Sequence, residues 1–210
     1  MINFSNRTPS YFPYVSVLIS LLFLLFLTLT EFTDFQPQIM TLYAIQTLDY
    51  WSLIQQQPTE ILRLLTSLFL HGNMVHWVIN YSIFALLAFS IERVISGQKF
   101  LLVFLSSGII GNLVASFFLQ EQNNLLIGAS GAVSGLIGYW LVLFPRKKIN
   151  FILPIGLYLQ KTSMPIAVVI ILWLVVQIIL QFQPQPSYDI AWLSHIMGFA
   201  TGFTLAWFIK

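Results

Sequence analysis

The sequence predicts an all-α membrane protein, a bundle of six transmembrane helices, and three observations carry that prediction. Of the 210 residues, 58% are hydrophobic and only 8% are charged, whereas a soluble domain usually has about 25% charged residues. The mean hydropathy is +0.84. Six nearly uncharged stretches each have about the length that crosses a bilayer as a helix. Together these figures exclude an ordinary soluble fold and a disordered chain, and the net charge of +2 indicates no nucleic-acid partner.

The six predicted helices belong to one domain, residues 1–210, and their limits are set by charges, prolines and polar clusters. They span approximately residues 11–33, 69–91, 100–119, 126–144, 164–182 and 189–209. The first apolar run is long for the core of a signal peptide and no small-residue cleavage site follows it, so we expect a retained helix. A long outer loop, residues 34–68, is expected between the first and second helices.

Lysine and arginine residues gather on one side of this arrangement. Six helices place both chain ends on the same side, together with the loops after the second and fourth helices. That side holds eight of the nine cations, which are Arg7, Arg93, Lys99, Arg146, Lys147, Lys148, Lys161 and Lys210. Only Arg63 falls on the opposite side, where it either anchors lipid headgroups or pairs with Glu60. Because cytoplasmic loops carry the excess of cations, we expect both termini to be cytoplasmic.

Polar residues inside such helices are costly and tend to mark functional sites. His76 and Asn80 are four residues apart on the second helix and therefore share one face. Ser130 lies near the start of the fourth helix and His195 near the start of the sixth. Since the second, fourth and sixth helices all enter from the outer side, these side chains are expected at a similar depth, on the order of 10 Å below the surface.

Small residues indicate which of these helices pack closely. Gly131, Gly135 and Gly138 form a stripe on the fourth helix, and Gly198 and Gly202 form one on the sixth. Contact between two such stripes brings helix backbones together. It would place Ser130 and His195 within hydrogen-bonding range, the arrangement of an activated nucleophile and its general base.

Three sequence elements, taken in this order, resemble the rhomboid intramembrane serine proteases across nearly the whole six-helix core. They are His76-x-x-x-Asn80, Gly128-Ala129-Ser130-Gly131 and His195-x-x-Gly198-x-x-x-Gly202. The resemblance implies that Ser130 is the nucleophile, His195 the base, and His76 and Asn80 the donors that stabilise the oxyanion. Arg63 and His71, which lie ahead of the second helix, also resemble the family pattern. We assign both residues to support of the outer loop.

The chain departs from the family pattern at three positions. Ser134 replaces an aromatic residue that packs on the catalytic histidine, and it is assigned to packing or to a hydrogen bond with His195. Leu62 and Ser194 stand where the family often has Trp and Ala. No acid is well placed to orient the base, because Asp189 lies about 9 Å along the helix from His195, so a dyad is expected rather than a triad.

The resulting prediction is a serine endopeptidase that cuts transmembrane or juxtamembrane segments of other membrane proteins within the lipid bilayer. No cofactor is expected. A zinc protease is disfavoured because residues 72–75, between His71 and His76, contain no acid. The compact core predicts a prokaryotic plasma membrane, with an organelle as the alternative, and the oligomeric state is left open.

Each candidate residue has an alternative, non-catalytic role, and the protein as a whole has alternative functions. Ser130 can serve helix packing, His195 can bond a carbonyl, and His76 with Asn80 can form an interhelical clasp. At the level of the protein, the competing functions are a catalytically silent relative that binds transmembrane helices and a transporter or channel. The transporter is disfavoured because the spans contain almost no ionisable residues besides histidine.

Overall fold

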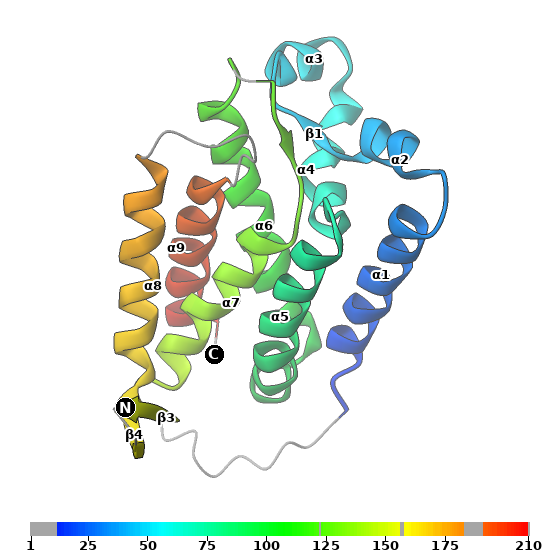
Figure 1. Cartoon of the computed structure of the whole chain (residues 1–210). Helices are drawn as coiled ribbons and strands as arrows, with labels where there is room; N and C mark the ends of the chain where they lie inside the picture. Colours follow the sequence, from blue (N-terminus) through cyan, green and yellow to red (C-terminus); the bar gives the residue numbers. More distant parts are fainter. Residues whose placement is uncertain (1–11, 122, 156–157, 183–190, 210) are drawn as a thin grey trace.

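The chain is mostly helical, and its computed structural model describes residues 12–121, 123–155, 158–182 and 191–209 (Figure 1). The α-helices of these residues are α1 (Tyr14–Glu31), α2 (Gln36–Tyr43), α3 (Tyr50–Gln56), α4 (Arg63–Thr66), α5 (Met74–Ile95), α6 (Gly97–Phe118), α7 (Ser130–Leu143), α8 (Ile166–Gln181) and α9 (Trp192–Phe208). Two 3-10 helices, η2 (Pro58–Leu62) and η3 (Ser67–Phe69), flank α4.

Two small antiparallel sheets complete the described part of the fold. Strand β1 (Ile45–Gln46) pairs with β2 (Leu125–Leu126), with Ile45 opposite Leu126. Strands β3 (Lys148–Ile155) and β4 (Tyr158–Pro165) pair along their whole length as a hairpin. Figure 1 shows the two sheets at opposite ends of the helical bundle, with α2, α3 and α4 gathered around β1.

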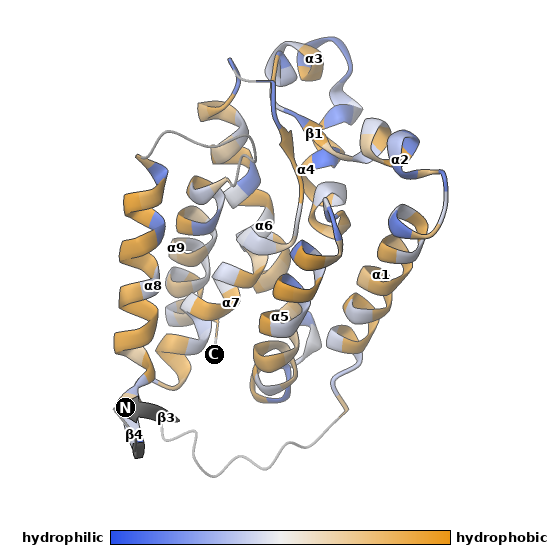
Figure 2. Cartoon of the chain, viewed as in Figure 1, coloured by the Kyte–Doolittle hydropathy of each residue, from blue (hydrophilic) through white to orange (hydrophobic). Residues whose placement is uncertain are grey.

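Among the described residues, three helices are long and apolar enough to cross a membrane, namely α1, α5 and α6. Helices α7 and α8 are also apolar but shorter. Hydrophobic residues run along the length of α1, α5 and α8, while hydrophilic residues concentrate in the segment that contains α3, β1 and α4 (Figure 2). Many large apolar side chains on these helices are exposed, among them Leu21, Leu86 and Leu172. This distribution is that of a protein whose outer surface faces lipid.

One helix overlaps each of the six predicted ranges, but several predicted limits are wrong. The second helix begins at Met74, not at residue 69, because the Asn73 side chain caps it by accepting a hydrogen bond from the His76 backbone N–H at 2.9 Å. The fourth begins at Ser130, not at residue 126, because Leu125 and Leu126 pair with β1. The hairpin β3–β4 was not predicted. Residues 11, 189 and 190, and the cations Arg7 and Lys210, lie outside the described residues.

Aromatic side chains fill the core between α1, α5 and α6. Phe23, Phe84 and Phe104 are fully buried, and their rings contact one another at centroid distances of 5.3–6.4 Å. Below them, the buried Glu92 of α5 accepts hydrogen bonds from the backbone N–H groups of Val15 and Ser16 at 3.0 and 2.7 Å. A carboxylate at a helix N-terminus satisfies donors that have no partner in the helix. Glu92 therefore fixes the start of α1 against the end of α5.

The segment between α1 and α5 is tied together by Arg63. Its guanidinium donates to the carbonyl oxygens of Thr41 and Ala44 at 2.7 and 2.9 Å and forms an ion pair with Glu60. Of the two predicted roles for Arg63, the structure has the pair with Glu60. Burial raises the pKa of Tyr50 to about 12, so its phenol stays neutral and donates to the Glu60 carbonyl at 2.9 Å.

Candidate active site

Ser130 is the first residue of α7. The first N–H groups of a helix have no partner within it and carry the positive end of the helix dipole. Because α7 begins four residues later than predicted, these free donors lie at Ser130 itself. The loop before α7 is bound to η3, because the Gly128 N–H donates a hydrogen bond to the Ser67 carbonyl at 2.9 Å. A half-buried hydroxyl thus sits at a helix end suited to hold negative charge.

Gly128 lets the His76 ring approach Ser130. Its φ of +111° is a conformation that favours glycine. A Cβ at this position would lie 2.7 Å from His76 Cε1, 2.8 Å from His76 Nε2 and 3.8 Å from Ser130 Oγ. The imidazole and the hydroxyl therefore both lie within 3.8 Å of the position that a Cβ on Gly128 would occupy.

The backbone around His76 determines which ring nitrogen faces this point. The Gly72 N–H donates to His76 Nδ1 in a long hydrogen bond of 3.4 Å. A neutral imidazole that accepts at Nδ1 carries its proton on Nε2. His76 thereby presents an N–H donor beside Ser130. Asn80, one turn further along α5, is buried and donates to the His76 carbonyl at 3.0 Å.

The two glycine stripes of α7 and α9 lie against each other. A Cβ on Gly198 would be 2.0 Å from the Gly131 carbonyl oxygen, and one on Gly202 would be 1.9 Å from that of Gly135. At these separations no residue larger than glycine fits without moving a helix. Gly131 also contacts Ser194, whose Oγ lies 2.6 Å from the position of a Cβ on Gly131. The immediate chain neighbours of Ser130 and His195 are thus in contact.

His195 is held from α8 by an amide. His195 Nδ1 lies 2.7 Å from Gln177 Oε1, and the Trp192 ring meets the imidazole edge-on at 5.6 Å. Among the hydrogen bonds of the described residues, none joins the His195 ring to the Ser130 hydroxyl. Catalytic hydrogen bonds are often loose before substrate binds, so the Ser130–His195 hydrogen bond stays a prediction.

Other predicted support residues lie nearby. The Ser134 hydroxyl donates to the Ser130 carbonyl at 2.7 Å, so its hydrogen bond goes to the Ser130 backbone and not to His195. His71 precedes α5 rather than lying within it, and its ring is buried 5.1 Å from the His76 ring. Neither nitrogen of His71 has a hydrogen-bond partner within the part of the chain that the structure describes.

A buried polar network beside His195 is not predicted by the sequence. The Asn112 side chain of α6 donates to Ser67 Oγ at 3.0 Å and to the Leu64 carbonyl at 3.3 Å, and it accepts from Ser194 Oγ at 3.1 Å. It joins α4 and η3, through α6, to the residue before His195. The only local signals were an asparagine inside an apolar helix and the unusual Ser194.

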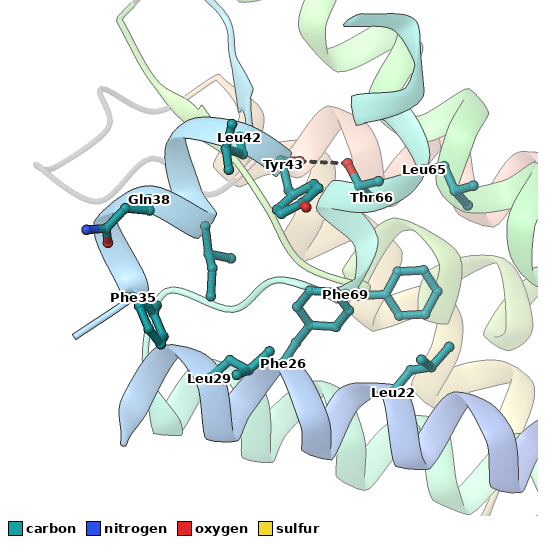
Figure 3. Close-up of a pocket in the computed structure, with 11 residues that line it drawn as sticks. Leu22, Phe26, Leu29, Phe35, Gln38, Leu42, Tyr43, Leu65, Thr66 and Phe69 are labelled. Atoms are coloured by element: carbon teal, nitrogen blue, oxygen red, sulfur yellow. Dashed lines mark hydrogen bonds between the residues drawn. The ribbon is translucent and has the colours of Figure 1, made fainter. Parts of the chain in front are cut away.

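The hollow shown in Figure 3 is not part of this site. It is an apolar groove of about 620 Å³ between α1, α2 and the α4 region, and its lining includes Phe26, Ile39 and Phe69. The Thr66 hydroxyl donates to the Tyr43 carbonyl at its rim at 2.8 Å. None of the candidate catalytic residues lines it.

Comparison with known proteins supports the resemblance seen in the sequence. Residues 58–210 match the family model described as "Rhomboid domain". The chain is 32% identical over 169 residues to "RHOMBOID-like protein 4" of Arabidopsis thaliana, covering 80% of this chain and 39% of that protein.

Two bacterial relatives from Bacillus subtilis (strain 168) carry protease names. Identity is 32% over 146 residues to "Putative rhomboid protease YdcA", which covers 69% of this chain and 65% of the relative. Identity is 30% over 154 residues to "Rhomboid protease GluP", which covers 73% and 28%. The chain spans less than two thirds of the length of each of these three relatives.

Proposed function

Because this chain belongs to the rhomboid family, and its relatives include proteins named as proteases, we propose that it is an intramembrane serine endopeptidase. The proposed reaction is cleavage of transmembrane or juxtamembrane segments of other membrane proteins by a Ser130–His195 dyad. One observation carries the proposal: the Ser130 hydroxyl lies at the start of α7, with the His76 ring beside it across Gly128.

The proposed mechanism assigns one step to each group. Ser130 Oγ bonds the scissile carbonyl carbon while its proton passes to His195, which later gives a proton to the leaving amine. The carbonyl oxygen gains negative charge at the N-terminus of α7. There the Ser130 backbone N–H and His76 Nε2–H donate to it, with Asn80 as a further donor after its amide turns away from the His76 carbonyl. Water then hydrolyses the acyl-enzyme and restores Ser130.

The membrane arrangement is part of the proposal. We assign α1, α5, α6, α7, α8 and α9 as six spans, with both termini cytoplasmic by the distribution of Lys and Arg. The segment with α2, α3 and α4 then lies at the outer face. Ser130, His76 and His195 each lie near that end of their helices, so the dyad would open outward, where water is available. A prokaryotic plasma membrane is the proposed location.

The competing proposal is a catalytically silent binder of transmembrane helices, since the family name alone does not establish activity. This chain retains both a serine and a histidine at the dyad positions, which favours the protease. The family membership, together with the scarcity of ionisable residues in the spans, leaves the transporter without support.

The test compares purified wild-type protein with Ser130→Ala and His195→Ala in liposomes that contain a labelled transmembrane substrate. Cleavage by the wild type alone supports the dyad, and cleavage that persists in both variants refutes it. A fluorophosphonate probe that labels the wild type but not Ser130→Ala reports the nucleophile without knowledge of the substrate. Binding of helices without cleavage or labelling would favour the silent binder.

A further inference from the structure

Gln177 is the one amide inside an otherwise apolar helix. Apart from Gln177 and from Gln181 at its end, α8 consists of Ile, Ala, Val, Leu and Trp residues. The neighbours Val176 and Ile178 are 49% and 42% exposed, whereas Gln177 is only 6% exposed. Gln177 therefore faces the bundle, and a polar group buried among apolar helices needs a partner to offset its lost hydration.

That partner is the imidazole of His195, and the contact determines its tautomer. The amide oxygen Oε1 carries no hydrogen, so at 2.7 Å from Nδ1 it accepts a hydrogen bond from an N–H that the ring must supply. With the opposite tautomer, the Nδ1 lone pair would face the oxygen lone pairs. In the neutral ring with Nδ1–H, the lone pair lies on Nε2, the nitrogen left free to take a proton.

Resting on the proposed function, we propose that Gln177 is the positioning residue of the dyad: it holds the His195 ring in the Nδ1–H tautomer, so that Nε2 takes the Ser130 proton. The role is that of the third member of a Ser-His-Asp triad, which orients the imidazole and fixes its tautomer without being protonated itself. When Ser130 Oγ bonds the carbonyl carbon, its proton moves to Nε2 and the carbonyl π electrons move to oxygen. The Nδ1–H to Oε1 hydrogen bond persists throughout.

The alternative is a purely structural tie between α8 and α9. Trp173 of α8 already contacts Phe199 of α9, with ring centroids 6.2 Å apart, so the helices also meet without the amide. A structural tie would affect stability whichever ring nitrogen is protonated. The tautomer of His195 and the reactivity of Ser130 therefore distinguish a structural role of Gln177 from a positioning role.

The first measurement is nitrogen NMR of the full chain in detergent, with 15N-labelled histidine. The chain has three histidines, so the His195 signals are identified by their loss in His195→Ala. We expect Nδ1–H and unprotonated Nε2 in the wild type, and a shift toward Nε2–H in Gln177→Met, which keeps the side-chain length but removes the amide oxygen. A wild-type ring protonated on Nε2 overturns the inference.

The second measurement is the rate of Ser130 labelling by a fluorophosphonate, together with kcat and KM on a transmembrane substrate. Gln177→Met should lower the labelling rate and kcat roughly 10²-fold, with KM little changed, because base catalysis contributes about 10²–10⁴-fold. Gln177→Glu, which keeps an oxygen acceptor, should recover most of the loss. Gln181→Met, the same substitution at the end of α8, is the matched control and should leave the rates unchanged.

These outcomes are distinguishable from failure of the proposed function. A wild-type protein that neither cleaves nor labels refutes the protease, whereas the tautomer is read without any reaction. Wild-type rates in a folded Gln177→Met, with folding checked by its thermal unfolding midpoint, overturn the positioning role even if the protease assignment stands. If Gln177→Met unfolds, the comparison of Gln177→Glu with Gln181→Met still decides it: loss of labelling in a folded Gln177→Glu overturns the inference, and near wild-type labelling supports it.

Discussion

The two histidines near the candidate nucleophile are held in different ways. His76 is positioned by its own neighbourhood in the chain: Asn73 caps its helix, and the Gly72 N–H contacts its ring. His195 is positioned across the bundle, by Gln177, which is 18 residues away in sequence and lies on another helix. One ring presents an N–H and the other is proposed to present a lone pair. In the proposed roles, the oxyanion donor is positioned by local sequence, whereas the base is positioned by packing between helices.

Loss of the base should give the largest effect. In His195→Ala no group remains to take the Ser130 proton, so cleavage should fall on the order of 10⁴-fold or more, as in other serine hydrolases that lose their histidine. The measurement is single-turnover cleavage of a transmembrane substrate in liposomes. Cleavage within tenfold of the wild type would show that His195 is not the base.

Loss of the donor should cost less. His76→Ala leaves Ser130, His195 and the α7 N-terminus in place but removes one N–H from the oxyanion, so kcat should fall about 10²–10³-fold. The same variant should still react with a fluorophosphonate, slowly, whereas His195→Ala should not. If His76→Ala proves more damaging than His195→Ala, the assigned roles of the two rings are reversed.

An added methyl group should separate His76 from Ser130 without removing either. Gly128→Ala places a Cβ 2.7 Å from the ring and requires a φ of +111°, a strain of about 1–3 kcal/mol for a residue with a side chain. We expect kcat to fall about tenfold or more, because displacing the His76 ring weakens its hydrogen bond to the oxyanion and each 1.36 kcal/mol in the barrier is a factor of ten. The matched control is Gly72→Ala, whose Cβ would meet only Ile127 Cδ1 at 3.6 Å. Equal losses in both would contradict this account.

The difference between short sequence patterns and contacts between distant segments also explains which features the sequence could predict. The spacing of His76 and Asn80, the run around Ser130 and the glycine stripes are short patterns, and the structure has α7 and α9 in contact where the stripes lie. Gln177, in contrast, is a single amide in α8, and its contact with His195 depends on the packing of α8 against α9. Asn112 reaches Ser194, 82 residues away.

The start of α7 shows how pairing between distant segments overrides a local pattern. Residues 126–129 continue the apolar run and favour a helix, yet Leu126 pairs with Ile45 in the outer segment. The first free N–H groups of α7 therefore lie at Ser130, and not four residues earlier, because Leu125 and Leu126 pair with a strand about 80 residues away in the sequence. Hydrophobic periodicity carries no information about that pairing.

The smallest expected effect tests whether the Asn73 cap supports His76 alone and has no influence on His195. Asn73→Ala removes the cap on the His76 backbone N–H and should lower the stability of α5 by about 1 kcal/mol. For a chain of this size that corresponds to about 2–4 °C in the unfolding midpoint, measured in detergent. Asn73→Asp keeps the acceptor and is the matched control. Because Gln177 holds His195 independently, the His195 tautomer in Asn73→Ala should be that of the wild type, and a changed tautomer would show that the two histidines are not supported separately.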